Sequence, residues 1–364
     1  MAFQQEFEMY GHPSIYNPRE RKLKVYFSEP NGGVNRNTGI LLLIPGFGGN
    51  ANSNVYKKMR DYFADEYNLI VVQCDYFGWE FMQAPNNLSL NINKEELTKL
   101  FNEKETNYIF KDKEFLIRLI EVASKYNYNI LCNEILDEDL TNFNDMGIMQ
   151  ALDNISAVVT VIEIIKDNGY KFDESKIIIY GHSHGAYLGY LCNAFAPNLF
   201  SMIIDNSAWL FPAYLYSNRY VNTTYGKTVL SVQFEYLAKN VEFDKEIIDL
   251  NLLYKNVKNQ SKIVCYHGID DNLISIDDKS RFANNIDGFV LNQVSTNDVD
   301  GIIFKSTQHG LGADFIKLFE FTMKNYAEIE NDKKILLNNV MYETSKKRYY
   351  FDYSNIVPNL RLEW

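Results

Sequence analysis

The alternation of apolar and polar stretches along the chain predicts strands and helices in turn. Residues 40–44 and 69–73 are continuous apolar runs, which are typical of strands covered on both faces. Residues 52–67 between them have a helical pattern, and a strand, a helix and a strand in that order require a parallel sheet. Further strands are predicted at residues 22–27, 176–180, 202–204, 263–266 and 301–305, further helices at residues 148–162 and 186–195, and a strand or hairpin after Lys346. We therefore expect an α/β fold with a doubly wound, mostly parallel sheet.

Two long segments, residues 76–144 and 209–260, interrupt this alternation. Ordinary βα connections are only a few residues long, and helical patterns such as residues 114–125 indicate ordered insertions rather than loops. Insertions at the carboxyl ends of parallel strands lie beside the ligand crevice of such folds. We therefore expect one domain of 364 residues that carries helical lid insertions. Its predicted core comprises residues 22–75, 145–208 and 261–330.

The composition indicates a globular protein and argues against several partners. Hydrophobic residues make up 46% of the chain and charged residues 23%, so a large core can be buried. The net charge is −11 and no basic stripe is present, so we expect no nucleic-acid partner. The four cysteines are far apart and have no CxxC spacing, which favours reduced thiols over zinc ligands or disulfides. With no signal peptide or membrane span recognised, we expect a cytoplasmic protein, and the oligomeric state stays open.

The strongest local motif is Gly181-His182-Ser183-His184-Gly185, which lies between a predicted strand and a predicted helix. A serine on such a sharp turn holds its hydroxyl above the sheet, and the small residues on either side let the backbone pass close to its neighbours. The helix that follows points its first amides at the same place, where they favour negative charge. The motif resembles the G-x-S-x-G nucleophile elbow of the α/β-hydrolase superfamily, which makes Ser183 the candidate nucleophile.

This resemblance implies an acid and then a histidine further along the chain. The segment from His267 to Ile274 is similar to the loop that carries the acid in this superfamily, and it places the acid at Asp271. Asp270 and Asp205 are the alternatives for this role. Of the five histidines, only His309 follows Asp271, and it lies after a predicted last strand and before a helix. The candidate triad is therefore Ser183, Asp271 and His309.

The glycine-rich segment 45–50 resembles the turn that supplies an oxyanion hole in these enzymes. Its glycines let main-chain amides approach a substrate oxygen. The expected donors are the amide of Phe47 or Gly46 and the amide of His184, the residue after the nucleophile. Pro45 stands where many lipases and esterases have histidine, which leaves these amide donors intact but makes a lipase-like subclass less well supported.

Each of these features alone also has a purely structural explanation. Ser183 could be a small residue in a tight turn, the Asp270-Asp271 pair a solvated turn, and His309 a helix cap. The glycine-rich segment lacks both the GxGxxG spacing and a Gly-Lys-Ser ending, so it does not predict nucleotide binding. The histidines that flank the nucleophile diverge and have no third ligand at suitable spacing, so we expect no metal and no cofactor.

Together the features predict a serine hydrolase that cleaves a carboxylic ester or thioester through an acyl-enzyme intermediate. The substrate is expected to be a small-molecule or glycan acyl compound, and the aromatic residues Tyr76 and Trp209 are candidates for its pocket, or equally for the core of a lid. The segment 44–54 also resembles a bacterial family of α/β-hydrolase-like proteins with no assigned reaction. One alternative is an O-acyltransferase or deacetylase acting on a sugar or glycan, by similarity to the glycan O-acetyltransferase of accessory secretion systems. The other is a non-catalytic binding protein with the same fold.

Overall fold

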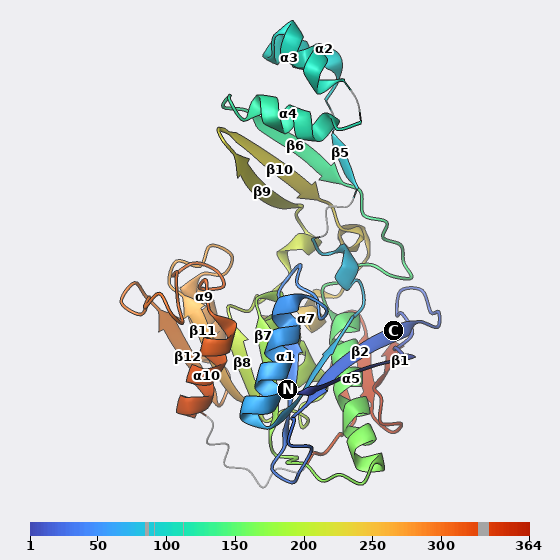
Figure 1. Cartoon of the computed structure of the whole chain (residues 1–364). Helices are drawn as coiled ribbons and strands as arrows, with labels where there is room; N and C mark the ends of the chain where they lie inside the picture. Colours follow the sequence, from blue (N-terminus) through green and yellow to red (C-terminus); the bar gives the residue numbers. More distant parts are fainter. Residues whose placement is uncertain (84–86, 91, 112, 327–334) are drawn as a thin grey trace. The chain divides into compact units, whose positions relative to one another are not determined.

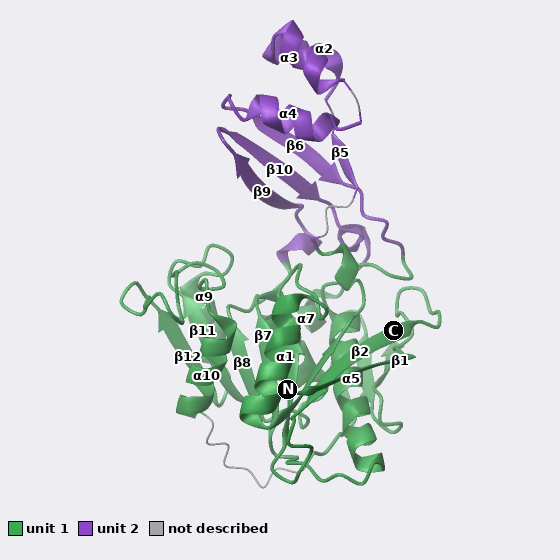
Figure 2. Ribbon diagram, in the orientation of Figure 1, with its two compact units in different colours: residues 1–82, 140–212, 243–364 green, residues 83–139, 213–242 purple. Residues whose placement is uncertain are grey.

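The computed structural model describes residues 1–83, 87–90, 92–111, 113–326 and 335–364. The chain forms two compact units, which are coloured separately in Figure 2. Unit 1 comprises residues 1–82, 140–212 and 243–364, and unit 2 comprises residues 83–139 and 213–242. Both segments of unit 2 lie inside the insertions predicted at residues 76–144 and 209–260.

Unit 1 is built on an eight-stranded sheet (Figure 1). Its strands are β1 (Phe3–Tyr10), β2 (Lys22–Glu29), β3 (Gly39–Ile44), β4 (Leu69–Cys74), β7 (Ile177–His182), β8 (Met202–Asn206), β11 (Lys262–Gly268) and β12 (Phe289–Val294). The spatial order is β1-β2-β4-β3-β7-β8-β11-β12. The pairs β1–β2 and β2–β4 are antiparallel and the other neighbours are parallel. The predicted doubly wound, mostly parallel sheet is therefore confirmed.

Helices pack against both faces of this sheet. The helical segments of unit 1 are α1 (Asn54–Tyr67), η1 (Trp79–Phe81), α5 (Ile148–Asp167), α6 (His184–Phe195), α7 (Lys245–Ile248), α8 (Leu250–Leu253), α9 (Ile276–Ala283) and α10 (Phe315–Tyr326). On one face, Phe63 of α1 and Phe319 of α10 pack against each other, with ring centroids 4.3 Å apart, and both contact Tyr180 of β7. On the other face, Gly189 of α6 lies directly against Ile179. The strands β3, β4 and β7 are thus buried on both faces, as their continuous apolar runs predict.

The central helix α5 is apolar along most of its length. Among the described residues it is the one helix that is long and apolar enough to cross a membrane, but 83% of its apolar window is buried inside the protein. It packs against α6 and β4. In this structure it is therefore a core helix of unit 1.

The C-terminal residues form a small antiparallel sheet of β13 (Val340–Glu343), β14 (Arg348–Asp352) and β15 (Asn359–Glu363), in agreement with the predicted terminal hairpin. It packs on the end of α6. The Phe351 ring stacks on Phe195 at 4.2 Å, and the hydroxyl of Tyr342 donates to the carbonyl of Ala194. These contacts attach the chain terminus to the helix that follows the candidate nucleophile.

Unit 2 has a four-stranded sheet of its own, in the order β5-β6-β10-β9. Its elements are β5 (Leu88–Leu90), α2 (Lys94–Leu100), α3 (Glu103–Ile109), α4 (Phe115–Ala123), β6 (Asn129–Glu134), η2 (Ala213–Leu215), β9 (Arg219–Tyr225), β10 (Thr228–Phe234) and η3 (Leu237–Asn240). The two segments are joined by the parallel pair β6–β10, in which Ile130 lies opposite Leu230. The predicted helices are present, and the sheet is an addition that the sequence pattern did not predict.

One strand prediction needs correction, and one edge strand was not predicted. Residues 301–305 do not form a strand, because the amides of Ile302, Ile303 and Phe304 all donate to the carboxylate of Asp300 and hold a turn. The last strand of the sheet is β12 instead. The strand β1 was not predicted either, because it is an edge strand with no fully buried residue.

Candidate active site

Ser183 lies on the sharp turn between β7 and α6 at the carboxyl end of the sheet. Its backbone has φ 52° and ψ −114°, a conformation that a non-glycine residue adopts only when its surroundings enforce it. The glycines on either side are sterically required. A Cβ at Gly181 would lie 2.4 Å from Cα of Ala186, and a Cβ at Gly185 would lie 2.3 Å from the carbonyl oxygen of Ile44. The predicted elbow geometry is therefore present.

The structure brings the three residues of the candidate triad together. Oγ of Ser183 lies 2.7 Å from Nε2 of His309, and Nδ1 of His309 lies 2.8 Å from Oδ2 of Asp271. An ionised carboxylate can only accept, so the proton of His309 is on Nδ1 and Nε2 is the acceptor for the serine hydroxyl. The His309 side chain is 19% exposed and that of Asp271 is 0% exposed. The chain of hydrogen bonds thus runs from a buried acid to an accessible imidazole.

The loop of residues 268–274 holds Asp271 in its ionised form. Oδ1 of Asp271 accepts the amides of Leu273 and Ile274 at 2.9 and 3.1 Å. Burial raises the pKa of Asp271, but the hydrogen bond and the electrostatic attraction to His309, together with the Leu273 amide, outweigh this effect, so the pKa lies below the ordinary value. The group is therefore a carboxylate at neutral pH.

The two alternative acids have other partners. The carboxylate of Asp270 is exposed and accepts the hydroxyl of Thr307 at 2.6 Å. Asp205 is fully buried and accepts the Tyr190 hydroxyl and the amide of Ala208, at 2.8 and 2.7 Å. Of the three aspartates, Asp271 is the one bonded to His309.

Sequence reasoning missed the segment that connects the nucleophile with the histidine loop. The carbonyl of Asn206 accepts the amide of Ser183 at 2.8 Å, and Oγ of Ser207 accepts the amide of Gly310 at 3.1 Å. Ser207 has φ 60°, a left-handed conformation that is unusual for serine. The only signal in the sequence is the polar run Asp205-Asn206-Ser207 directly after the predicted strand 202–204.

The candidate oxyanion donors come from the turn after β3 and from the start of α6. The amide of Gly49 donates to the carbonyl of Gly46 at 2.8 Å and closes a turn in which Gly48 has φ 87°. The Gly46 amide donates to the hydroxyl of Tyr56 at 3.4 Å, so it is already engaged within the protein. His184 is the first residue of α6, so its amide has no partner within the helix.

The side chains of His182 and His184 point to different partners. The ring of His182 stacks on Phe315 at 3.7 Å and bonds the Tyr56 hydroxyl through Nδ1, whereas Nε2 of His184 lies 2.7 Å from Oε1 of Gln150. Burial lowers the pKa of each histidine to about 3, so both rings are neutral. Within the described parts of the chain, no group of three or more His, Cys, Asp or Glu side chains is arranged to hold a metal ion.

His267 is a buried neighbour of the triad acid. Its Nε2 donates to the carbonyl of Ile274 at 2.8 Å and lies 3.6 Å from Oδ2 of Asp271. Burial and the nearby Lys279 lower its pKa. The ring therefore supports the acid loop as a neutral donor.

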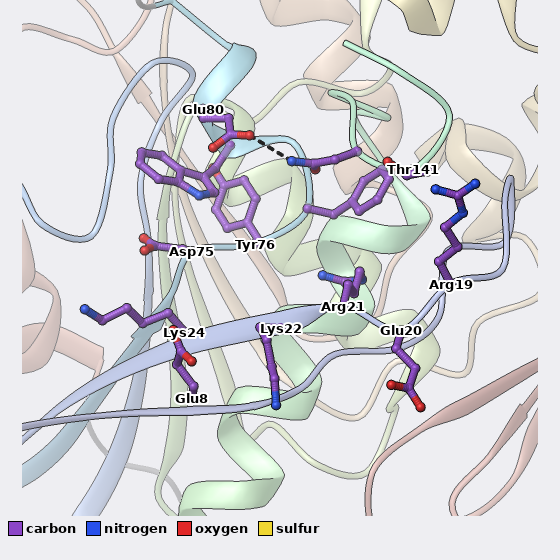
Figure 3. A pocket seen from close by; sticks show the side chains of 13 residues that line it. Glu8, Arg19, Glu20, Arg21, Lys22, Lys24, Asp75, Tyr76, Glu80 and Thr141 are labelled. Atoms are coloured by element: carbon purple, nitrogen blue, oxygen red, sulfur yellow. Dashed lines mark hydrogen bonds between the residues drawn. The ribbon is translucent and has the colours of Figure 1, made fainter. Parts of the chain in front are cut away.

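The two aromatic pocket candidates lie in different surroundings. Trp209 is buried beside the candidate oxyanion donors, with ring centroids 5.4 Å from Phe47 and 5.0 Å from His184. Tyr76 instead donates its hydroxyl to the sulfur of Met82 and lines a cavity of about 370 Å³ (Figure 3). Residues 19–22 also line this cavity, and none of the triad residues does. Of the two pocket candidates, Trp209 is thus the one that contacts residues of the candidate site.

The strand order, with two antiparallel pairs at one edge, and the strained serine at the end of β7 define an α/β-hydrolase fold. The chain belongs to the family described as "Protein of unknown function (DUF2920)", whose model matches residues 5–363. The search of curated proteins found no match.

Several solved structures are similar to the chain. Est1E from Butyrivibrio proteoclasticus is 12% identical with a TM-score of 0.43, over 88% of this chain and 99% of that chain. An S-formylglutathione hydrolase from Agrobacterium tumefaciens is 12% identical with a TM-score of 0.48, over 91% and 96% of the two chains. A dienelactone hydrolase from Anabaena variabilis is 12% identical with a TM-score of 0.42, over 90% and 98%.

Proposed function

We propose that the protein is a serine hydrolase that cleaves a carboxylic ester or thioester through an acyl-enzyme intermediate. The observation that carries the proposal is the unbroken hydrogen-bond chain from Ser183 through His309 to Asp271, with contacts of 2.7 and 2.8 Å. Nucleophile, base and orienting acid stand in the order and at the distances that this chemistry needs.

In the first half of the reaction, Oγ of Ser183 attacks the carbonyl carbon of the substrate while its proton moves to Nε2 of His309. Asp271 stabilises the imidazolium that forms, and the amides of Phe47 and His184 bind the oxyanion. The tetrahedral intermediate then collapses, the bond to the leaving group breaks, and His309 protonates that group. In the second half, His309 activates water, which releases the acid and restores Ser183.

The backbone strain at Ser183 supports a catalytic role over a binding role. A non-glycine residue in a sparsely populated conformation costs about 1–3 kcal/mol, which the surrounding structure has to offset. A non-catalytic binding protein with this fold would require neither a strained serine nor a buried carboxylate that is hydrogen-bonded to an accessible imidazole. The strain and the alignment together favour an enzyme.

The proposal is tested by labelling with a fluorophosphonate probe and by hydrolysis of p-nitrophenyl esters of increasing chain length. Wild type is expected to become labelled, and Ser183→Ala is expected to lose both labelling and hydrolysis. The matched control is Ser156→Ala, which removes a buried hydroxyl bonded within α5 and should leave both unchanged. An unlabelled wild type, or a Ser183→Ala variant labelled as fast as wild type, would falsify the proposal. Adding sugars as acceptors in the same assay distinguishes water from a sugar hydroxyl as the second substrate.

A further inference from the structure

Gln150 is a fully buried polar side chain in the first turn of α5, and it makes three hydrogen bonds. Its Oε1 lies 2.7 Å from Nε2 of His184. Its Nε2 donates to the carbonyl of Phe77 at 3.0 Å and to Oδ1 of Asn144 at 2.9 Å. A buried carboxamide held by three hydrogen bonds fixes the groups around it. Gln150 therefore ties the start of α6 to the segment that follows β4.

These bonds determine which ring nitrogen of His184 carries the proton. The Phe77 carbonyl can only accept, so the NH₂ of Gln150 faces it and the amide oxygen Oε1, which is an acceptor, faces His184. His184 must then be the donor through Nε2, and Nδ1 carries the lone pair. In the described structure Nδ1 is buried and has no hydrogen-bond partner. Among the residues that the structure describes, Gln150 is therefore the one polar anchor of this imidazole.

The His184 ring also contacts the other side of the proposed oxyanion hole. Its centroid lies 5.4 Å from the Phe47 ring, in an edge-to-face arrangement, and the ring packs on Trp209 as well. The amides of His184 and Phe47 are the two donors proposed above. A tilt of this imidazole would thus be transmitted to the residues on both sides of the oxyanion.

We propose that Gln150 is a positioning residue of the oxyanion hole, an inference that rests on the proposed function. By holding the His184 ring in one tautomer and one orientation, it sets the separation between the amide at the start of α6 and the amide of Phe47. Oxyanion donors act only when they lie about 2.7–3.1 Å from the developing charge, and loss of one donor costs about 10²–10³ in kcat. Misplacing a donor is expected to cost part of that factor and to leave ground-state binding nearly unchanged.

The test compares Gln150→Met, which keeps the volume but removes every bond, with Gln150→Glu, which keeps an acceptor opposite His184. Ser156→Ala is the control, since this buried hydroxyl on the same helix donates to the Leu152 carbonyl one turn before it. For each variant kcat and KM are measured with a p-nitrophenyl ester, folding is checked by thermal melting, and the ¹⁵N shifts of the His184 ring report its tautomer.

Wild type is expected to show the Nε2–H tautomer. Gln150→Met should lose that signature and about 10–100-fold in kcat, with KM within about threefold. Gln150→Glu should recover part of kcat, and Ser156→Ala should match wild type.

The proposal is overturned by an Nδ1–H tautomer in wild type, by an unchanged kcat in folded Gln150→Met, or by a loss that falls on KM instead of kcat. If Gln150→Met does not fold, the wild-type tautomer and the kinetics of Gln150→Glu decide. If wild type is not labelled by a fluorophosphonate, the serine-hydrolase proposal fails, and this role of Gln150 fails with it. The tautomer of His184 then reports only whether the hydrogen bond to Gln150 is present.

Discussion

Replacing Asp271 with asparagine is expected to lower kcat by about four orders of magnitude without unfolding the protein. One oxygen of Asp271 accepts the loop amides of Leu273 and Ile274, and the other accepts Nδ1–H of His309. An asparagine has one acceptor and one donor, so it can match one side of this arrangement but not both. The structure indicates which side is kept.

In the Asp271→Asn variant, the side-chain amide oxygen should remain with the two loop amides. Turning it toward His309 would lose two hydrogen bonds at about 1 kcal/mol each and leave their donors facing an NH₂ group, a total of roughly 2–3 kcal/mol or about 30–150-fold. In the preferred orientation the NH₂ donates to Nδ1 and forces the ring proton onto Nε2, which can then no longer accept the proton of Ser183. Loss of the negative charge beside the imidazolium accounts for the rest of the effect.

The assay is p-nitrophenyl ester hydrolysis by wild type, Asp271→Asn and a control, Asp270→Asn. The control removes an exposed neighbouring carboxylate that is bonded to Thr307, so its kcat should stay within about threefold of wild type. Thermal melting checks that both variants are folded. If Asp271→Asn keeps more than about a tenth of wild-type kcat, or if the control loses as much activity, the assignment of the acid is wrong.

Three further outcomes follow from the structure. Gly185→Ala should destabilise the protein by about 1–3 kcal/mol or prevent folding, because its Cβ would lie 2.3 Å from a carbonyl oxygen of β3. Gly32→Ala is the control and should have little effect, because the space around Gly32 is open. Urea unfolding measures both variants, and equal stabilities would contradict the steric argument. Ser207→Ala should lower kcat about three- to tenfold by releasing the loop of His309, a loss of roughly 1 kcal/mol, and an unchanged kcat would show that this hydroxyl is dispensable. Stability should fall between pH 7 and pH 5, because the two histidines that flank the nucleophile have a folded pKa of about 3 and protonate first in the unfolded chain. By pH 5, each of these histidines lowers the free energy of unfolding by about 2 kcal/mol. Asp145 offsets about 1 kcal/mol of this loss, because burial raises its pKa to about 6 and it therefore stabilises the fold as pH falls. A urea unfolding midpoint that is the same at pH 7 and pH 5 would refute this balance.

The parts of the site that the sequence predicted are carried by short local segments. The serine elbow follows from a predicted strand, a tight turn and a helix within residues 176–195, and the acid was placed by the resemblance of the segment after a strand to the acid loop of the superfamily. The contacts of Asn206, Ser207 and Gln150 were not predictable in the same way. They join different strands and helices, and no local periodicity reports which side chains meet across a sheet.

The fold errors have a similar cause. Residues 301–305 have the apolar run of a strand, but the amides of residues 302–304 donate to the carboxylate of Asp300 instead of to a neighbouring strand. Hydrogen bonds to one nearby side chain thus override the apolar pattern. The sheet of unit 2 depends on the pairing of β6 with β10, and each of these strands is short and lies far from the other in the sequence. Only the pairing, and not the pattern within either segment, specifies that sheet.

The division of unit 2 between two segments has a consequence for biosynthesis. Ile130 pairs with Leu230, so the ribosome must add 230 − 130 = 100 residues before β6 finds its parallel partner. At about 5–20 residues per second this is a wait of roughly 5–20 s. Throughout that interval the nascent chain carries Ile130 and Cys132 on an incomplete sheet, while the nucleophile-bearing half of the polypeptide is still emerging.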